Sequence, residues 1–319
     1  MRIVVTGALG HIGSRLIREL PYAFPDAEIV MVDNLSTRRY ASLFDLPGIG
    51  RYRFLELDVL SADLVPVFDG ADAVLHLAAI TDATESFLIR EQVEEVNFIG
   101  TEKVARACVQ AGCALLFVST TSVYGSQAEL VDEACADSDL QPQSPYAQSK
   151  LRAERLLHAM GRSRGLRHVI CRFGTIFGIS PGMRFHTAVN KFCWQAATGA
   201  PLTVWQDSLH QQRPYLDLRD AIGAITFLLQ RGLFDGRVFN VLTLNAAVSR
   251  ILDAISAYMP DLRVEYVRHR IMNQLSYRVS NRRFAKLGFE FRGDLDREIG
   301  ETIRMLRPAV GVRAASAAD

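Results

Sequence analysis

The sequence lacks a membrane-spanning run, a strong net charge and a signal peptide. No apolar run approaches the ~20 residues that a helix needs to cross a bilayer, and the chain begins directly with a strand-like run. Its 36 Lys and Arg residues balance 35 Asp and Glu, which leaves a formal net charge of +1. We therefore expect a cytoplasmic protein that binds neither nucleic acid nor membranes, because both surfaces attract strongly basic proteins.

Cysteine is also scarce. The number of cysteines is odd and their spacing shows no metal-type pairing: Cys108, Cys113, Cys135, Cys171 and Cys193. This pattern predicts a reducing compartment, mostly buried thiols and no bound metal. The 319 residues, 49% hydrophobic and 22% charged, indicate a globular protein with a sizeable core.

Strand-like runs alternate with helical patterns through the first half of the chain. The runs occupy residues 2–6, 28–32, 52–57, 72–79 and 114–118, and a sixth follows at 167–173. Helical patterns cover residues 12–20, which we expect Pro21 to end, and residues 86–112. The alternation predicts an α/β fold with a Rossmann-type, doubly wound parallel sheet whose strands end at one edge.

A glycine loop joins the first strand to the first helix. It reads Thr6-Gly7-Ala8-Leu9-Gly10-His11-Ile12-Gly13. The glycines allow a tight turn and close approach to a pyrophosphate, which the N–H groups of a helix N-terminus can bind. Asp33 follows Gly13 by twenty residues, the distance of an acidic residue that bonds the ribose of NAD. Arg38 and Arg39 leave NADP open as a lesser option.

Other residues near the predicted strand ends are candidates for contact with NAD. Small residues follow the fourth strand, and Asn97 is a polar interruption that could bond to a neighbouring strand. Asp58 either contacts the adenine or caps a helix that starts near Ser61. His76 lies in an apolar strand and is interpreted as a hydrogen-bonded core residue. The remaining candidates are Asn34, Val59, Leu77, Ala78, Ala79, Ser119 and Phe173.

Tyr146 and Lys150 form the main catalytic candidate. Pro145 suits the first turn of a helix, and the four-residue spacing places both side chains on one helical face. An ammonium group near a tyrosine hydroxyl favours the phenolate and brings its pKa toward neutral pH, where the tyrosine can act as a base. The same spacing also occurs by chance on exposed helices, so the pair gains weight only from the dinucleotide site that precedes it.

The regular alternation of strand-like and helical patterns ends near residue 180. We predict a dinucleotide-binding domain at residues 1–178, a mainly substrate-binding mixed α/β lobe at 179–308, and a frayed, Ala-rich tail at 309–319. A return of the chain to the first domain near 213–240 stays open.

With these motifs in place, the chain resembles the extended short-chain dehydrogenase/reductase family, in its nucleotide-sugar epimerase/dehydratase branch. The resemblance rests on residues 6–13, 76–79, 119–125, 142–150, 172–178, 213–215 and 273–277. It implies NAD as cofactor, a UDP or dTDP sugar as substrate, and a homodimer. It also implies catalytic roles for Thr120, Tyr146 and Lys150, with Lys150 lowering the pKa of Tyr146 and holding the nicotinamide ribose.

Departures from the family pattern reduce the number of reactions that we expect. Dehydratases of this branch carry Asp-Glu just after the catalytic threonine, whereas this chain has Thr121 and Ser122. Dehydration would therefore lack its proton carriers. Thr175 replaces the usual Asn of the Arg-x-x-Asn-x-x-Gly motif, so the sugar contacts at this position change.

Substrate contacts are predicted mainly from arginines. Arg213 is the leading candidate for the diphosphate, because a guanidinium can bond two oxygens at once. Arg270 is a second candidate, for which a surface ion pair is an equal alternative. Arg184 would meet a carboxylate if the sugar is a uronic acid. Val204, Thr121, Ser122 and Thr175 complete the predicted substrate set.

These residues favour an NAD-dependent nucleotide-sugar 4-epimerase that forms a transient 4-keto sugar. The alternatives are a nucleotide-sugar dehydrogenase or keto-sugar reductase with net turnover of NAD(P)(H), a 4,6-dehydratase, and an NAD-sensing regulator without catalysis. The intact Thr120, Tyr146 and Lys150 argue against the regulator. Polysaccharide synthesis is the expected setting.

Overall fold

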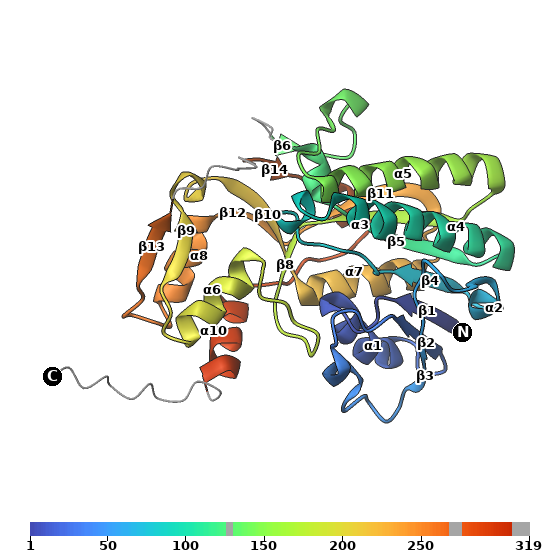
Figure 1. Cartoon of the computed structure of the whole chain (residues 1–319), viewed down its shortest axis with the longest axis horizontal. Coiled ribbons are helices and arrows are strands. Elements are labelled where there is room, and N and C mark those ends of the chain that lie inside the picture. The colour runs from blue at the N-terminus through green and yellow to red at the C-terminus, as the bar shows by residue number, and fades with distance from the viewer. Residues whose placement is uncertain (126–129, 268–275, 308–319) are drawn as a thin grey trace.

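The computed structural model describes residues 1–125, 130–267 and 276–307. Its centre is a seven-stranded parallel sheet with the strand order β11-β7-β5-β4-β1-β2-β3 (Figure 1). These strands are β1 (Arg2–Thr6), β2 (Glu28–Asp33), β3 (Arg51–Glu56), β4 (Ala73–His76), β5 (Ala114–Thr120), β7 (His168–Phe173) and β11 (Asp235–Val241). The predicted doubly wound Rossmann-type sheet is therefore confirmed.

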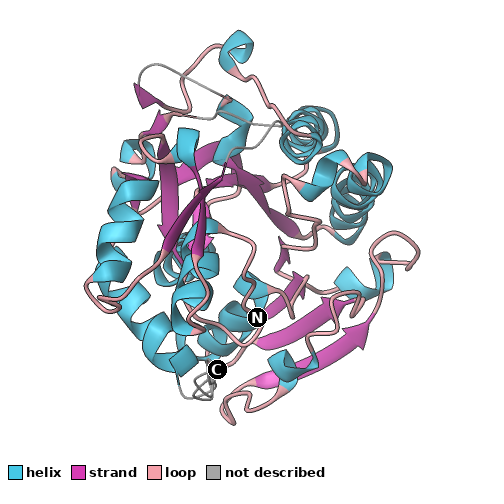
Figure 2. Cartoon of the chain, turned by 60° about the vertical axis from the view of Figure 1, so that its left-hand side comes forward, coloured by secondary structure: helices cyan, strands magenta, loops and turns pink. Residues whose placement is uncertain are grey.

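Helices cover both faces of this sheet (Figure 2). One face packs on α1 (His11–Ala23), α7 (Leu218–Arg231) and α9 (Arg282–Ala285), and the other on α2 (Val65–Phe68), α4 (Gly100–Ala111) and α5 (Pro145–Arg164). Alternation along the strands explains both layers, because Ile3 and Val5 face α1 whereas Val4 faces the opposite layer. Apolar residues on both faces are typical of a buried parallel sheet.

A smaller lobe is built from the second half of the chain. It contains a mixed sheet of β8 (Thr175–Phe177), β10 (Gln212–Asp217) and β12 (Leu244–Ala247), in which β10 pairs parallel to β8 and antiparallel to β12. The strands β9 (Leu202–Trp205) and β13 (Val264–Val267) form a second, parallel pair. The helices α6 (Ala188–Ala197), α8 (Val248–Ser256) and α10 (Leu295–Leu306) pack around a shared core. The predicted mixed α/β lobe is confirmed.

The chain returns to the large sheet at β11, which pairs with β7. This return falls in the range that the sequence left open, while the exact division into domains stays a prediction. Two short strands, β6 (Leu130–Val131) and β14 (Arg278–Val279), also pair across the chain and were not predicted. The predicted tail at 309–319 lies outside the described residues. Across the described part, no helix combines the length and apolar character needed to cross a bilayer.

Pro21 does not end the first helix, contrary to expectation, because α1 continues to Ala23. A proline inside a helix leaves the carbonyl four residues earlier without its N–H partner. Here that carbonyl belongs to Ile17, and the hydroxyl of Tyr52 donates to it at 3.1 Å. A side chain from β3 therefore replaces the missing bond.

Two other helix predictions were also incomplete. No helix starts near Ser61; Asp58 instead accepts a bond from the N–H of Leu60 at 2.8 Å in a turn. The pattern at 86–112 divides into a short helix α3 (Arg90–Glu94), a π-helical turn (Glu95–Ile99) and α4. Such π turns occur often at functional sites.

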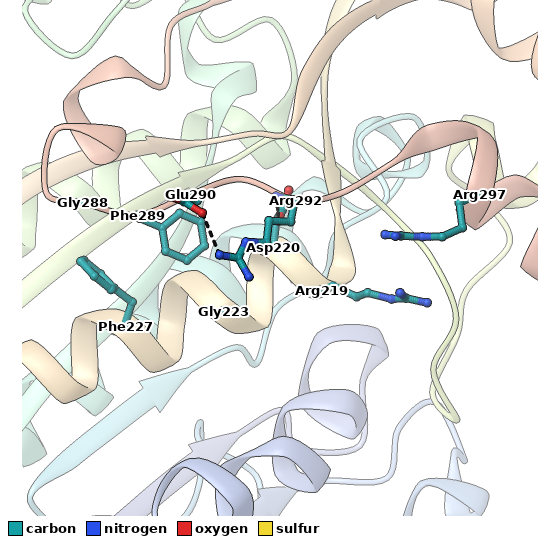
Figure 3. Close-up of a pocket in the computed structure, with 9 residues that line it drawn as sticks. All are labelled: Arg219, Asp220, Gly223, Phe227, Gly288, Phe289, Glu290, Arg292 and Arg297. Atoms are coloured by element: carbon teal, nitrogen blue, oxygen red, sulfur yellow. Dashed lines mark hydrogen bonds and ion pairs between the residues drawn. The ribbon is translucent and has the colours of Figure 1, made fainter.

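A surface hollow of about 660 Å³ lies between α7 and the segment before α10 (Figure 3). Phe227 and Phe289 form its apolar wall, and Arg292 pairs with Glu290 at 2.7 Å. Buried Asp220 accepts the backbone N–H groups of Arg292 and Gly293. These contacts fasten the C-terminal segment to α7, and the hollow shares no lining residue with the cleft described below.

Candidate active site

A cleft of about 820 Å³ opens where the parallel strands of the large sheet end. Ligands of open α/β sheets bind at this edge, because the loops that follow the strands converge there. Most residues predicted from the sequence line it: Gly7, Gly10, His11, Ile12, Gly13, Asp33, Asn34, Asp58, Val59, Leu77, Ala78, Ala79, Ser119, Thr120, Ser122, Tyr146, Lys150, Phe173, Thr175, Arg184 and Arg213.

The glycine loop has no room for side chains. Gly7 has φ = +68°, and a Cβ atom there would lie 2.6 Å from the backbone nitrogen of Ala78. A Cβ atom on Gly13 would lie 2.4 Å from the carbonyl oxygen of Gly7. Backbone without side chains therefore lies at the N-terminus of α1. A dinucleotide pyrophosphate binds at this kind of position.

Acidic and amide side chains line the adenosine end of the cleft. Asp33 accepts backbone N–H bonds from Leu9 at 3.0 Å and from Leu35 at 2.9 Å, which fixes its carboxylate beside the glycine loop. The amide of Asn34 donates to Asp58 at 2.9 Å. Because a carboxylate at this position accepts ribose hydroxyls and repels a 2′-phosphate, the arrangement fits NAD.

The catalytic candidates meet at the other end of the cleft. Thr120 ends β5, while Tyr146 and Lys150 project from the first turns of α5. That helix starts where the sequence indicates, because the hydroxyl of Ser144 accepts the N–H of Ala147 at 3.2 Å and Pro145 takes the first position. The hydroxyl of Thr120 accepts the N–H of Ser122 at 3.1 Å, and Thr120 and Tyr146 both line the cleft.

Residues 180–186, here called the strap, cross from the lobe to the glycine loop. The N–H of Gly182 donates to the hydroxyl of Ser14 at 2.9 Å. Arg184 donates to the hydroxyl of Thr81, and its Nε is buried without a hydrogen-bond partner among the described residues. Just before the strap, the carbonyl of Gly178 contacts the ring Nε2 of His11 at 2.9 Å. The strap thus contacts both α1 and the loop that follows β4.

Comparison with known proteins agrees with this geometry. The sequence profile of the NAD dependent epimerase/dehydratase family matches residues 3–241. The chain belongs to this family.

Two curated relatives show the range of the family. The chain is 30% identical over 298 residues to a trifunctional UDP-glucose 4,6-dehydratase/UDP-4-keto-6-deoxy-D-glucose 3,5-epimerase/UDP-4-keto-L-rhamnose-reductase of Arabidopsis thaliana, covering 90% of this chain. It spans only 44% of that plant protein's length. It is also 31% identical to the uncharacterized UDP-glucose epimerase YtcB of Bacillus subtilis, over 76% of each chain.

Solved structures share the fold over almost the whole chain. MoeE5, in complex with UDP-glucuronic acid and NAD, is 28% identical with a TM-score of 0.82, and the match covers 97% of this chain and 100% of MoeE5. UDP-glucuronic acid 4-epimerase of Bacillus cereus, at 24% identity, has a TM-score of 0.86 over 97% and 100% of the two chains. The second likeness supports the fold alone.

Different neighbours affect Tyr146 and Lys150. Burial raises the pKa of Tyr146, and the charge of Arg184 and the bond from Thr120 oppose that rise. Lys150 is also buried, and its Nζ donates to the carbonyl of Val118 at 2.9 Å. Arg184 is therefore the cation placed to favour the phenolate, and the predicted effect of Lys150 on the pKa of Tyr146 stays a prediction.

Some predicted residues lie outside the cleft. Thr121 is buried and donates to the carbonyl of Phe173, and Val204 lies in the core of the lobe. The amide oxygen of Asn97 accepts the N–H of Ile80 at 2.8 Å, and its amide nitrogen donates to the carbonyl of Ile80 at 2.9 Å. Asn97 therefore holds the loop that follows β4. Arg270 lies outside the described residues.

Sequence reasoning missed several residues that line the cleft, chiefly Thr81, Asp82 and His186. Of the two arginines that kept NADP open, Arg39 lines the cleft near Gly10, whereas Arg38 is exposed. Leu35 and Arg38 have positive φ angles of 55° and 52°. Both residues lie in the turn that precedes Arg39, and the sequence pattern did not indicate this turn.

The strap contact gives a testable expectation. A Cβ atom at position 182 would lie 2.3 Å from the carbonyl oxygen of Leu9, so Gly182→Ala must displace the strap. We expect the purified variant to lose NAD about 10-fold faster than the unmodified protein, since overpacking costs about 1–3 kcal/mol. Gly48→Ala, at an exposed position with no atom within 4 Å, is the control. Equal NAD retention in both variants would contradict the expectation.

Proposed function

We propose that the protein is an NAD-dependent nucleotide-sugar epimerase that inverts C4 through a transient 4-keto sugar. The observation that carries this proposal is that Thr120, Tyr146 and Lys150 line the same cleft as the glycine loop. A hydroxyl pair at the nicotinamide end of a dinucleotide site is placed to deprotonate an alcohol.

Each residue of the cleft has a separate role in the proposed reaction. When bound, NAD would supply a reversible hydride acceptor for the sugar C4. Tyr146 takes the proton of the C4 hydroxyl, and Thr120 hydrogen-bonds the same oxygen. Arg184 favours the ionised form of Tyr146, and Lys150 holds the ribose next to the nicotinamide. Gly7 allows the tight turn, Gly10 leaves room for the pyrophosphate, and Gly13 allows close packing of α1 on the loop. Asp33 accepts hydrogen bonds from the adenosine ribose.

Inversion requires that the sugar turns over while the nucleotide stays fixed. The chain offers Arg213 on β10 for the diphosphate, because this guanidinium lines the cleft on the side of the lobe. Ser122 and Thr175 line the same cleft. We propose that their short hydroxyl side chains leave space for two sugar orientations. We propose a UDP or dTDP sugar as the substrate.

Arg184 favours a sugar with a carboxylate. Arg184 is half-buried, and its Nε is buried without a hydrogen-bond partner among the described residues. Leaving a buried charged donor without a partner is costly, so an anionic group is the expected occupant. A uronic acid would supply it, and MoeE5, which shares the fold at 28% identity, was solved with UDP-glucuronic acid.

This assignment predicts the outcome of Arg184→Gln. The ratio of kcat/KM for UDP-glucuronic acid to kcat/KM for UDP-glucose should fall about 10- to 100-fold, since a hydrogen bond to a charged group contributes about 1.5–3 kcal/mol. Using the ratio removes any loss that both sugars share through Tyr146. An unchanged ratio would show that Arg184 does not recognise the carboxylate.

The main alternative is a net oxidoreductase, either a nucleotide-sugar dehydrogenase or a keto-sugar reductase. An epimerase keeps its NAD and forms product without added cofactor, whereas a net oxidoreductase produces or consumes NADH stoichiometrically. Incubating the purified protein with UDP-glucuronic acid, with and without added NAD, distinguishes the two by NADH absorbance and by chromatography of the sugars.

A 4,6-dehydratase is less favoured. Thr121 and Ser122 stand where the family resemblance implies the acidic pair of dehydratases, and neither hydroxyl can act as a carboxylic acid. We further propose a cytoplasmic homodimer with a role in polysaccharide synthesis, following the family resemblance. Size-exclusion chromatography with light scattering tests the dimer.

A further inference from the structure

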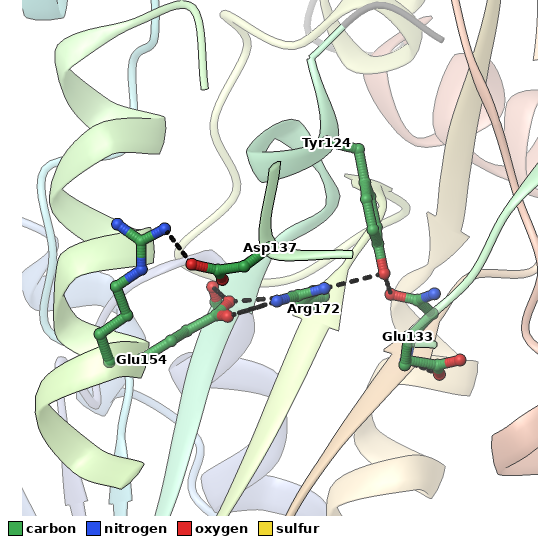
Figure 4. A network of polar contacts seen from close by, with 8 residues as sticks. Tyr124, Glu133, Asp137, Glu154 and Arg172 are labelled. Carbon is green, nitrogen blue, oxygen red and sulfur yellow. Dashed lines mark hydrogen bonds and ion pairs between the residues drawn. The ribbon is translucent and has the colours of Figure 1, made fainter. Parts of the chain in front are cut away.

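A buried ion pair lies behind the catalytic residues, one helical turn beyond Lys150 (Figure 4). Glu154 on α5 and Arg172 on β7 are 2% and 5% exposed. The guanidinium Nη2 of Arg172 donates to Oε2 of Glu154 at 2.7 Å, and its Nε lies 3.1 Å from both carboxylate oxygens. Breaking such a pair on one side is costly, because it leaves a buried charge without compensation.

The rest of the network fixes the pair in place. Ser119 donates to Oε1 of Glu154, and Nη1 of Arg172 donates to the hydroxyl of Tyr124 at 2.9 Å. That hydroxyl in turn donates to the amide oxygen of Asn240 at 2.8 Å. Buried networks whose members all have partners are rigid. The carboxylate of Glu154 therefore has a fixed position relative to α5.

Glu154 lies one helical turn from Lys150 on α5, and both side chains are buried. The Nζ of Lys150 lies 4.6 Å from the centroid of the Phe117 ring and bonds to a neutral carbonyl, and no carboxylate of the described residues forms an ion pair with it. Burial lowers the pKa of Lys150 to about 7, and the charge of Glu154 opposes this effect.

A further titratable group beside Lys150, His76, carries no charge near neutral pH. His76 on β4 is fully buried and bonds through its two ring nitrogens to the hydroxyls of Thr6 and Thr101. Burial, with a further contribution from Lys150, lowers its pKa to about 3, so it is neutral. On β5, Lys150 contacts the Phe117 ring and the Val118 carbonyl. On β7, the charged group is Arg172, which pairs with Glu154.

We propose that the Glu154–Arg172 ion pair sets the charge of Lys150, with Glu154 keeping it cationic near neutral pH and Arg172 limiting that effect. Both are positioning residues, because they touch neither substrate nor cofactor but act through Lys150. The importance of this charge for turnover rests on the proposed function. The charge itself can be measured without any substrate.

The two partners should shift Lys150 in opposite directions. Glu154→Gln removes the anion and leaves the cation of Arg172, so Lys150 should lose its proton at lower pH. Arg172→Met leaves the anion of Glu154, still bonded by Ser119, so Lys150 should keep its proton to higher pH. If the pair only supported the fold, both variants would loosen the site and shift Lys150 in the same direction or not at all.

The test is a pH titration of the lysine Cε resonances by NMR, on protein labelled with ¹³C-lysine and purified with its cofactor. The chain has only four lysines, Lys103, Lys150, Lys191 and Lys286, and the variant Lys150→Met assigns the signal. We expect Lys150 to titrate about one pH unit lower in Glu154→Gln and about one unit higher in Arg172→Met, the shift typical of one nearby charge. The other three lysines are internal controls.

Equal titration of Lys150 in all variants, or shifts of the same sign, would overturn the proposal. Should Glu154→Gln fail to fold, Glu154→Asp keeps the charge and must restore the unmodified titration, while Arg172→Met must still show the upward shift. Turnover then separates this inference from the proposed function: absent epimerisation together with opposite lysine shifts refutes only the function.

Discussion

Replacing Tyr146 with Phe should reduce turnover about 100- to 10,000-fold, the range that a positioned general base contributes. The phenol is the group placed to take the sugar proton, because it lines the cleft and because Arg184 and Thr120 oppose the rise that burial causes in its pKa. NAD binding should persist, since the ring remains and the glycine loop is untouched. Progress curves with UDP-glucuronic acid and the NAD content of the purified variant measure both effects.

The comparison that matters is Tyr124→Phe. Tyr124 is also a buried tyrosine, but its hydroxyl belongs to the network of Arg172 and Asn240 and does not line the cleft. A loss of turnover in Tyr124→Phe as large as in Tyr146→Phe would mean that disturbed packing, and not the missing base, explains the result.

The second large effect is expected at the glycine loop. Gly13→Ala places a Cβ atom 2.4 Å from the carbonyl oxygen of Gly7 and 2.7 Å from that of Ala8, and neither backbone group is the end of a flexible side chain. Because overpacking of this kind costs about 1–3 kcal/mol, NAD affinity should fall about 10- to 100-fold. Isothermal titration calorimetry with NAD measures the change.

A matched substitution controls for general effects of an added methyl group. Gly48→Ala lies on the surface with no atom within 4 Å, so NAD affinity and thermal stability should stay unchanged. If Gly13→Ala binds NAD as tightly as Gly48→Ala does, the glycine loop cannot be the pyrophosphate site.

The sequence predicted the parts of the site that depend on local spacing. Gly7 and Gly10 share the turn before α1 and Gly13 lies in its first helical turn, while Tyr146 and Lys150 lie four residues apart on α5. Short patterns therefore determine their geometry. The alternation of strands with helices along the chain likewise predicted the layers around the large sheet. These features need no knowledge of distant contacts.

The parts that depend on distant contacts were not predicted. Ser14 meets Gly182, and the Ile17 carbonyl meets Tyr52, through side chains that no local pattern connects. For the same reason Pro21 wrongly indicated the end of a helix. Thr121 and Ser122 show a finer limit: they are adjacent, yet one donates to a backbone carbonyl behind the cleft and the other lines it.

The central claim is inversion at C4 without net oxidation, and an isotope experiment tests it most directly. The purified protein, without added NAD, is incubated with UDP-glucuronic acid that carries deuterium at C4, and the product is analysed by NMR and mass spectrometry. The account predicts a product inverted at C4 that keeps its deuterium, with no accumulation of NADH. Stoichiometric NADH, loss of water from the sugar, or solvent hydrogen at C4 would contradict it.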